Sequence, residues 1–442
     1  MKSEPPALDT IVSLAKRRGF VFPGSEIYGG LAGTFDYGPH GVVLKENIKN
    51  LWRRMFVEER DDMYQVDAAI LMNPKIWEAS GHVAGFSDPL VECSNCKKRF
   101  RADHLEDPNT CPSCGKKGTL GEARQFNMMF ATKAGASEDE AATVYLRPET
   151  AGGMFVNFKN VVDSFHPKLP FGLAQIGKAF RNEIAPRDYI FRLRELEQME
   201  VEYFVRPDEW EQAFEEWRVT MHAFAEELGL DAVHELEVGE GDRAHYSKRT
   251  IDFEFDYPFG RKELWGLAYR GDFDLVAHQS GSSVNLEYQD EELKEKVLPH
   301  VIEPSLGLDR TFLATLLAAY REDELGGETR AYLALPPAIA PVKAMVSPLL
   351  KNKPELVEKA KAVRTELRKI HPAIAWDDNG NIGKRYRRQD EIGTPFCITI
   401  DFDTLGETPD LKDTVTLRHR DTGEQERLSI IEVVERIRDS LS

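Results

Sequence analysis

The chain has 442 residues, a length that favours two or three domains over a single core. Its formal net charge of −18 gives no overall positive field that would attract nucleic acid, although a local basic strip could still do so. No apolar run reaches the roughly 18 residues that a membrane-spanning helix needs, so we expect no membrane partner. The N-terminal residues form neither an apolar signal region nor a transit segment, which predicts a cytoplasmic location.

The first fifty residues combine a short helix, a glycine-rich stretch and a longer helix. Apolar spacing predicts a helix over residues 8–18 that ends at Gly19. Residues 24–41 are rich in glycine but match neither a GxGxxG nor a Walker phosphate loop, so they predict close backbone packing. Pro39 then precedes a predicted helix, and its apolar stripe with Trp52 could face the core or a second subunit.

Four of the five cysteines fall in a polar island, residues 91–122, where apolar periodicity stops. They form two Cys-x2-Cys pairs, which are Cys93 with Cys96 and Cys111 with Cys114. Each such turn presents two sulfurs, so the spacing predicts a four-thiolate zinc site. Four protein ligands leave no open position, and we therefore expect a structural metal. Buried free thiols are the alternative, and the polarity of the island disfavours it.

Residues 171–204 predict an antiparallel hairpin with a long polar loop. Alternation puts a set of small and polar residues on one face of the first strand: Gln175, Gly177, Ala179, Arg181 and Glu183. It puts a second set on one face of the other strand: Arg192, Arg194, Gln198 and Glu200. Such a face could form the floor of a site for a charged ligand. It could equally be a solvated surface with weak ion pairs.

The middle of the chain predicts further helices and strands. Asp208 with Glu211 forms a capping-box pattern at the start of a helix whose aromatic stripe is expected in the core. Strands are predicted over residues 251–257 and 263–268. Residues 301–310 predict a strand, a glycine turn and an apolar helix. Arg310 falls in the first turn of that helix, where its charge opposes the helix dipole, so this position predicts a bound anion.

The last third of the chain predicts a separate α/β domain after a linker at residues 322–328. Strands are expected over residues 331–335, 342–346, 374–376, 396–401 and 414–418. Helices are expected to begin near Pro354 and at Ser429, where Glu432 completes a capping box. Residues 383–389 are basic with an aromatic residue inside, which indicates an RNA-facing strip or an ordinary solvated helix face.

Several strings resemble those of the class II aminoacyl-tRNA synthetases. Residues 180–183 followed by Arg192 resemble motif 2, residues 307–310 resemble motif 3, and residues 37–54 resemble motif 1, which lies at the dimer interface in that class. Longer strings are similar to the homodimeric type of glycyl-tRNA synthetase: residues 17–20, 25–30, 147–151, 180–187, 197–200 and 303–305. The likeness runs from about residue 8 to the C-terminus.

This resemblance implies an α+β fold with three parts. These are a catalytic domain on an antiparallel sheet (residues 1–325), a zinc-ribbon-like insertion within it (residues 91–122) and an α/β anticodon-binding domain (residues 329–442). It implies a homodimer that activates glycine with ATP and Mg²⁺ to glycyl-adenylate, then transfers glycine to the 3′ end of its tRNA. The alternatives are another class II synthetase, such as one for threonine, proline or histidine, and a non-catalytic synthetase-like tRNA-binding protein.

The resemblance also assigns roles to single residues. The catalytic set would be Arg181, Glu183 and Arg310, and ATP would also contact Asn182, Phe191, Arg192, Leu196, Glu263 and Leu264. Glycine would be received by Glu149, Glu200, Glu303 and Ser305, and Mg²⁺ by Glu263 and Glu303. Arg187 is expected to meet the tRNA acceptor end. Two residues depart from the family pattern: Leu196 stands where an aromatic usually stacks on adenine, and Gly152 where Gln is frequent.

Overall fold

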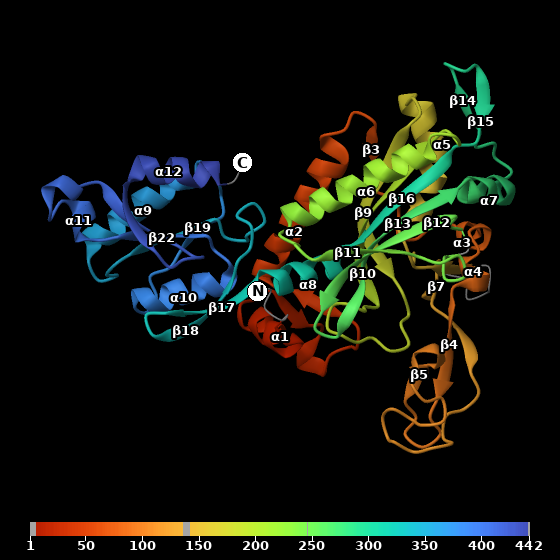
Figure 1. The fold of residues 1–442 in the computed structure, drawn as a ribbon, viewed down its shortest axis with the longest axis horizontal. Helices are drawn as coiled ribbons and strands as arrows, with labels where there is room; N and C mark the ends of the chain where they lie inside the picture. The colour runs from red at the N-terminus through yellow and green to blue at the C-terminus, as the bar shows by residue number, and fades with distance from the viewer. Residues whose placement is uncertain (1–5, 136–141, 245, 441–442) are drawn as a thin grey trace.

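The computed structural model describes residues 6–135, 142–244 and 246–440. A large α+β part occupies the right of Figure 1, and a smaller C-terminal α/β part occupies the left. The fold class predicted from the sequence is therefore confirmed. Among the described residues, no helix is both long enough and apolar enough to cross a membrane.

The large part is built on a seven-stranded sheet of order β11-β12-β13-β16-β10-β9-β3. All neighbours run antiparallel except β3 and β9. The predicted hairpin over residues 171–204 forms two inner strands of this sheet, β9 and β10. The strand predicted over residues 263–268 is longer than expected. In chain order the strands are β3 (Met63–Gln65), β9 (Phe171–Phe180), β10 (Glu195–Val205), β11 (Val233–Glu237), β12 (Arg249–Tyr257), β13 (Gly260–Gly271) and β16 (His300–Gly307).

Helices cover both faces of this sheet. The main apolar cluster joins one face to α1 (Leu8–Arg17), α2 (Pro39–Arg53), α6 (Trp210–Glu227) and α8 (Leu308–Ala319). A second cluster joins the other face to α5 (Ala151–Phe165) and α7 (Phe273–Ser282), next to the short α3 (Lys75–Ala79) and α4 (His82–Gly85). Trp52 is fully buried and stacks on Phe56 in the π-helical turn η2 (Arg54–Glu58), so its stripe faces the core. The sheet is thus the middle layer of three.

The start of α6 corrects a prediction. The helix begins at Trp210 with Glu209 as N-cap, and no side chain caps it. The preceding residues form a turn in which the Glu209 N–H donates to the Arg206 carbonyl at 3.0 Å. The chain therefore enters the helix later than the capping-box pattern of Asp208 and Glu211 suggested, and that prediction was wrong.

The glycine-rich stretch packs closely against the backbone, as its composition predicts. It carries η1 (Glu26–Tyr28) and pairs β1 (Val21–Pro23) with β2 (Phe35–Tyr37). A Cβ atom on Gly41 would lie 1.8 Å from the Phe20 carbonyl oxygen, and one on Gly38 would lie 2.5 Å from the Gly19 oxygen. Only glycine leaves room for this contact, which seats the start of α2 against the end of α1.

The cysteine-bearing island is a small module that projects from the large part at the lower right of Figure 1. Its sheet has the order β5-β4-β6, from β4 (Ser87–Glu92), β5 (Arg99–Arg101) and β6 (Arg124–Asn127), and η3 (Ala102–His104) follows β5. Two further hairpins complete the large part. They are β7 (Ala131–Lys133) with β8 (Thr143–Tyr145), and β14 (Tyr288–Asp290) with β15 (Glu295–Val297).

The C-terminal part has a five-stranded mixed sheet of order β20-β19-β21-β22-β23. Its strands are β19 (Ala344–Pro348), β20 (Ile374–Trp376), β21 (Phe396–Ile400), β22 (Thr414–His419) and β23 (Gln425–Ser429). Its helical segments are α9 (Pro354–Leu367), α10 (Ile382–Ile392), α11 (Phe402–Leu405), η5 (Pro409–Leu411) and α12 (Ile430–Asp439). The capping box of Ser429 and Glu432 is confirmed, whereas β23 was not predicted.

The segment predicted as a linker is a β-hairpin instead. β17 (Tyr320–Leu325) pairs with β18 (Glu328–Leu333) across a turn in which Gly326 and Gly327 both have positive φ. Two such glycines suit a two-residue hairpin turn, a signal hidden here among charged residues. Arg330 of β18 is fully buried and donates to Asp323 of β17 and to Asp390 of α10. The hairpin therefore joins the two parts of the molecule, and the boundary expected between residues 325 and 329 falls at its turn.

The basic run at residues 383–389 lies in α10 and only partly faces outward. Arg385 is 2% exposed and donates to the Ser347 hydroxyl and the Pro348 carbonyl, both at 2.6 Å. Tyr386 is also buried, while Arg387 and Arg388 pair with Glu328 and Asp377. Neither an RNA-facing strip nor a solvated helix face describes the whole run, because the charge of Arg385 is buried and bonds groups of the interior.

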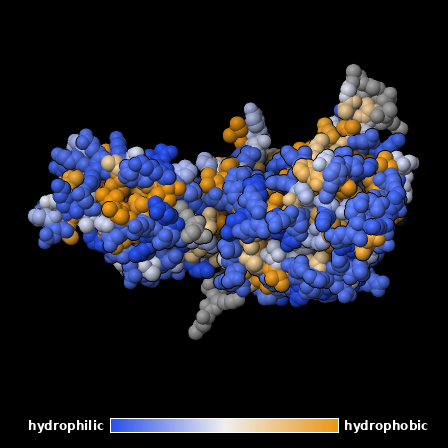
Figure 2. Space-filling view, turned by 90° about the horizontal axis from the view of Figure 1, so that it is seen from above, coloured by the Kyte–Doolittle hydropathy of each residue, from blue (hydrophilic) through white to orange (hydrophobic). Residues whose placement is uncertain are grey.

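Figure 2 shows a largely hydrophilic surface with separate hydrophobic patches, one of them on the C-terminal part at the left. The most exposed large apolar side chains lie in the glycine-rich stretch, where Ile27 is 89% and Tyr28 is 88% exposed. Leu31 is 59% exposed in the same loop. This stretch therefore offers apolar surface that its own chain leaves uncovered.

Candidate active site

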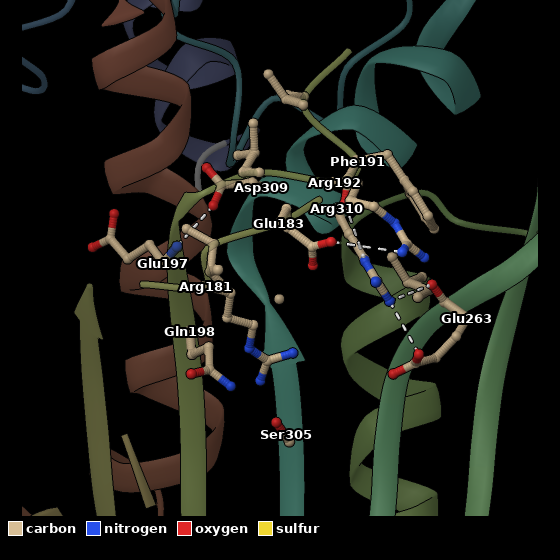
Figure 3. A pocket seen from close by; sticks show the side chains of 15 residues that line it. Arg181, Glu183, Phe191, Arg192, Glu197, Gln198, Glu263, Ser305, Asp309 and Arg310 are labelled. Carbon is tan, nitrogen blue, oxygen red and sulfur yellow. Dashed lines mark hydrogen bonds and ion pairs between the residues drawn. The ribbon is translucent and has the colours of Figure 1, made fainter. Parts of the chain in front are cut away.

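A cavity of about 140 Å³ opens where β10 begins, beside the N-terminus of α8 (Figure 3). Eight of the nine residues predicted to bind ATP line it: Arg181, Glu183, Phe191, Arg192, Leu196, Glu263, Leu264 and Arg310. Asn182 does not, and its backbone N–H donates to the Met128 carbonyl at 2.8 Å. Segments far apart in the sequence thus converge on one space.

Arg310 lies in the first turn of α8, as predicted. It donates to the Glu263 carbonyl at 3.0 Å and pairs with the Glu263 carboxylate at 3.1 Å. Its guanidinium also lies over the ring of Phe191, 4.4 Å from the ring centre. These contacts hold the cation at the helix N-terminus, where both the charge and the free backbone N–H groups favour an anion.

Glu183 is one of the acidic side chains that line this cavity (Figure 3). Its Oε2 atom is buried without a hydrogen-bond partner, and the nearest charge is Arg192 at 3.7 Å. Burial raises the pKa of Glu183, although Arg192 and Arg181 oppose that effect. A buried acceptor without a donor is costly, so this oxygen is suited to an N–H group of a ligand.

Apolar side chains form one wall of the cavity. Phe191 packs edge-on against Tyr257 and Phe259, with ring centres 5.0 and 5.1 Å away. Leu196 and Leu264 also line the space, so a flat ligand would meet an aliphatic side chain at Leu196. Apolar packing on a base is available there, but an aromatic stack from that position is not.

A buried ion network fixes α8 against β10 and α2. Lys45 of α2 lies 2.9 Å from the Glu197 carboxylate and 3.2 Å from that of Asp309. Asp309 also accepts bonds from the Tyr37 hydroxyl and, at 2.8 Å, from the Glu197 backbone N–H. Burial alone would lower the pKa of Lys45, but Asp309 and Glu197 outweigh it and raise the pKa. Because Arg310 follows Asp309 in the chain, this network sets its position.

The predicted hairpin face is correct for its strands but not for all of its loop. Gln198 and Glu200 stand opposite Gly177 and Gln175, so these four share one face. Arg194 turns away and donates to the carbonyls of Glu183 and Ala32. The reason is that β10 begins only at Glu195, so the alternation of the strand does not extend to Arg194.

A second cavity of about 270 Å³ adjoins the first, and Arg181, Gln198, Glu263 and Ser305 line both. It contains all four residues predicted to receive glycine: Glu149, Glu200, Glu303 and Ser305. The strand register explains why they meet, because Glu200 pairs with Ser305 and Glu303 pairs with Ala268 across the sheet. The floor of this cavity is therefore the face of the sheet toward α5 and α7.

Hydrogen bonds orient the carboxylates of the second cavity. Glu200 accepts from Ser305 at 2.6 Å and from Thr150 at its other oxygen. Glu149 lies 3.3 Å from the His82 ring nitrogen. Burial would raise the pKa of Glu149, but His82 and Arg270 outweigh it and hold the pKa well below its usual range. Glu149 is therefore a fixed negative charge beside the cavity.

Arg270 is the central cation of this region, and sequence reasoning did not assign it. Its side chain is fully buried and donates to both oxygens of Asp274, at 2.7 and 2.8 Å, and to Glu303 at 2.6 Å. Tyr246 lies across its other side, 3.6 Å from ring centre to guanidinium carbon. The four-residue spacing of Arg270 and Asp274 is the one feature of the sequence that could have indicated this pair. In a sequence, however, that spacing is equally typical of an exposed ion pair.

Carboxyls outnumber cations here, and that raises the affinity of some of them for protons. Burial raises the pKa of Glu303 to about 8, with Arg270 opposing and Glu200 and Glu149 adding to the rise. Burial and the nearby Glu149 likewise raise the pKa of Glu200. A cationic ligand group would relieve this repulsion, so the second cavity is suited to an ammonium.

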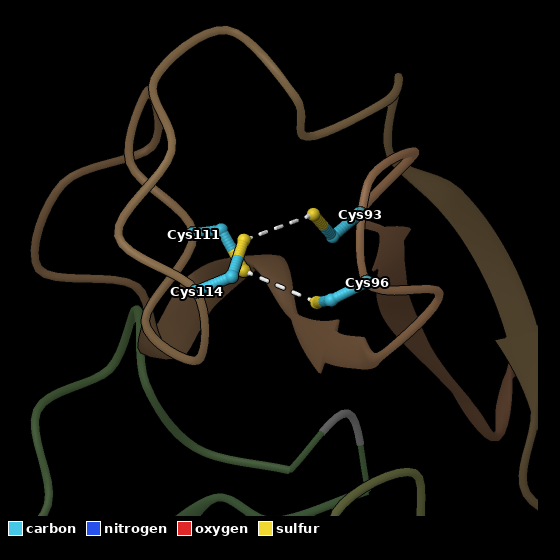
Figure 4. A group of neighbouring side chains, drawn as sticks. All are labelled: Cys93, Cys96, Cys111 and Cys114. Carbon is cyan, nitrogen blue, oxygen red and sulfur yellow. Dashed lines mark hydrogen bonds between the residues drawn. The ribbon is translucent and has the colours of Figure 1, made fainter.

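The four cysteines of the module form one cluster (Figure 4). The sulfurs of Cys93 and Cys114 are 3.8 Å apart, and those of Cys96 and Cys111 are 3.7 Å apart. Thiolates at the corners of a tetrahedron around zinc would be about 3.8 Å apart, given Zn–S bonds of about 2.3 Å. The cluster could therefore hold one metal ion with all four thiolates as ligands.

The cysteine module touches the loop between β9 and β10. Arg187 of that loop lies 3.5 Å from the His104 ring nitrogen of η3. Arg101 of β5 pairs with Asp88 at 2.7 Å. The half-exposed Arg187, predicted to meet RNA, thus lies at the junction of loop and module.

Comparisons with known proteins agree with this geometry. Residues 130–320 match the model of the tRNA synthetase class II core domain (G, H, P, S and T), and residues 343–440 match that of the anticodon binding domain. Three bacterial relatives are each named glycine–tRNA ligase. The relative from Lachnospira eligens is 50% identical over 458 aligned positions, which cover 96% of this chain and 97% of the relative.

The relative from Caldanaerobacter subterraneus subsp. tengcongensis is 48% identical over 463 positions, 98% of both chains. The relative from Thermobifida fusca is 47% identical over 467 positions, 100% of both chains. Similarity of this degree over the full length shows that the chain belongs to the glycine–tRNA ligase family of class II aminoacyl-tRNA synthetases.

Proposed function

We propose that this chain joins glycine to ATP, releases pyrophosphate and transfers the activated glycine to the 3′ end of its tRNA. The observation that carries this proposal is the pair of joined cavities, one lined by arginines and the other by carboxylates. The first suits a nucleoside triphosphate, and the second suits a small ammonium compound. The names of the relatives supply the amino acid.

In the first cavity, the proposed roles follow from charge and position. Arg181 and Arg310 neutralise phosphate oxygens from two sides, with Arg192 beside them. The unpartnered Oε2 of Glu183 accepts from the adenine amino group. Phe191 and Leu196 pack on the base. Because the carboxylate of glycine is already ionised at neutral pH, activation needs no general base, and catalysis rests on positioning and charge neutralisation.

In the second cavity, Glu200 and Glu303 receive the glycine ammonium, Glu149 adds negative charge, and Ser305 orients Glu200. Arg270, stacked on Tyr246, is held by Glu303 beside this cavity. No amino acid is smaller than glycine, so steric exclusion can reject every competitor without an editing step.

Magnesium is the cofactor of this class, and Glu263 fits it better than Glu303 does. The Glu263 carboxylate is half exposed at the junction of the cavities. Burial raises the pKa of the neighbouring Asp252 to about 7, and Glu263 adds to the rise, so a cation between these two would be favoured. Both carboxylates pair with an arginine, but Glu263 is half exposed whereas Glu303 is buried and accepts from Arg270 at 2.6 Å. When bound, the metal would neutralise phosphate charge.

Glycine-dependent exchange of pyrophosphate into ATP tests this proposal. We expect exchange with glycine and none with alanine, serine, threonine, proline or histidine. Arg310→Ala should lower exchange by at least about 100-fold because it removes a charge that stabilises the transition state. Arg321→Ala, an exposed arginine of β17 just past the end of α8, is the matched control. Exchange with another amino acid but not glycine would contradict the substrate.

Glycine binding should strengthen as the pH rises. Below pH 8 Glu303 is mostly protonated, and an ammonium binds a carboxylate better than a neutral acid. The glycine KM should therefore fall by up to about tenfold per pH unit between pH 6 and 8, then level off. Glu303→Gln cannot ionise and should flatten the profile. A glycine KM independent of pH in the unchanged chain would count against this role.

We also propose that the cysteine cluster holds one structural zinc. Metal analysis should find about one zinc per chain, and Cys96→Ser should lose it along with the fold of the module. Cys397→Ser is the matched control, because Cys397 is buried in the C-terminal part, outside the cluster. Four freely reactive thiols in metal-free native protein would refute the zinc site.

Finally, we propose that the chain acts as a homodimer in the cytoplasm. The resemblance to motif 1 and the exposed apolar loop with Ile27, Tyr28 and Leu31 support a second copy as the partner. Sedimentation should give twice the mass of one chain. Tyr28→Asp should weaken the dimer. Leu293→Asp, which also puts a charge at an exposed apolar position but outside this loop, should not. A monomer at micromolar concentration would contradict the proposal.

A further inference from the structure

One carboxyl beneath the second cavity has no place in the roles given so far. Glu202 of β10 is 0% exposed, and both of its carboxyl oxygens are buried without a hydrogen-bond partner. In the part of the chain that the structure describes, no other carboxyl has both oxygens in this condition. An ionised carboxylate without a donor in such a place would cost many kcal/mol, so Glu202 carries a proton.

The sheet register puts Glu202 next to Glu303, which lines the second cavity. Glu200 pairs with Ser305 and Tyr203 pairs with Ile302, and this register sets Glu202 directly opposite Glu303. Side chains at opposed positions lie on the same face with Cβ atoms about 5 Å apart. The acceptor nearest to a protonated Glu202 along the sheet is therefore the carboxyl of Glu303.

The other charged groups around Glu202 are already engaged. Arg270 of β13 donates to Asp274 of α7 and to Glu303. Glu200, two residues back on β10, is bonded to Ser305 and Thr150. On the β9 side Glu202 faces Leu173, which has no charge. Burial raises the pKa of Glu202 far above its usual value, and Glu303 adds to the rise while Arg270 opposes it.

We propose that Glu202 is a positioning residue for the amino acid substrate, a neutral acid that donates its hydrogen to the Glu303 carboxylate. Arg270 of β13 then donates to one oxygen of Glu303, and Glu202 of β10 donates to the same carboxylate. This inference rests on the proposed role of Glu303 in receiving the glycine ammonium. It gives Glu303 a hydrogen-bond donor without adding another negative charge beside it.

Two substitutions separate this role from others. Gln has the shape of a protonated Glu and also donates a hydrogen, so Glu202→Gln should leave the glycine KM within about twofold. Leu fills the space without a donor. Glu202→Leu should raise the glycine KM about tenfold, leave the ATP KM unchanged, and move the pH at which the glycine KM levels off upward by about one unit. Glu195→Leu, at an exposed position of the same strand, is the control.

Thermal melting gives a readout that needs no activity. A raised folded-state pKa means that the unfolded chain loses the Glu202 proton from about pH 4.5 upward while the folded chain keeps it. This costs stability as the pH rises, and Gln removes the cost. The melting temperature of Glu202→Gln should therefore exceed that of the unchanged chain, by a gap that is small at pH 5 and widens toward pH 8.

Specific results would overturn the proposal. A glycine KM raised equally by Gln and Leu would mean that an ionised carboxylate is needed. An unchanged KM and pH profile in both variants would mean that Glu202 only fills space. If Glu202→Leu does not fold, a melting gap for Glu202→Gln that fails to widen with pH is decisive against it. Failure of the proposed function itself would look different, since the unchanged chain would then lack glycine-dependent exchange.

Discussion

The candidate site depends on one register of strand pairing, that of β10 between β9 and β16. The pairing of Glu200 with Gln175 on one side and with Ser305 on the other aligns rows of polar side chains across three strands. A slip of one residue would turn Gln198, Glu200 and Glu202 toward the apolar layer of α6 and α8, and would bring Met199 and Val201 into the cavity. The large apolar cluster around Met199 and Val201 makes such a slip very costly.

The register also creates the electrostatic character of the site. β10, β13, β16 and α7 bring more carboxyls than cations into a buried space, and Arg270 is shared between Asp274 and Glu303. The second cavity therefore favours a positively charged ligand group, and it lies next to the arginines of the first cavity. The first cavity thus gathers three arginines among its acidic side chains, carboxyls predominate in the second, and the two meet at Arg181, Gln198, Glu263 and Ser305. A zwitterion next to a polyphosphate matches that division.

Sequence reasoning reached features whose residues are close together in the chain. The cysteine pairs, the hairpin over residues 171–204 and Arg310 in a first helical turn all have local signals. It did not reach Arg270, Glu202 or the network of Lys45 and Asp309, because those depend on which strands and helices become neighbours. The β17–β18 hairpin was missed because its strands are highly charged, and the box at Asp208 because a local turn delays the helix.

The cysteine module enters and leaves the large part of the molecule at nearly the same place. β4 and β6 are antiparallel neighbours, with Ser87 opposite Asn127, so about forty residues are inserted between two adjacent points of the backbone. The module can therefore lengthen, shrink or disappear over evolution while the strands that carry the site keep their register. The module has its own cysteine cluster, and it contacts the loop with Arg187 through His104.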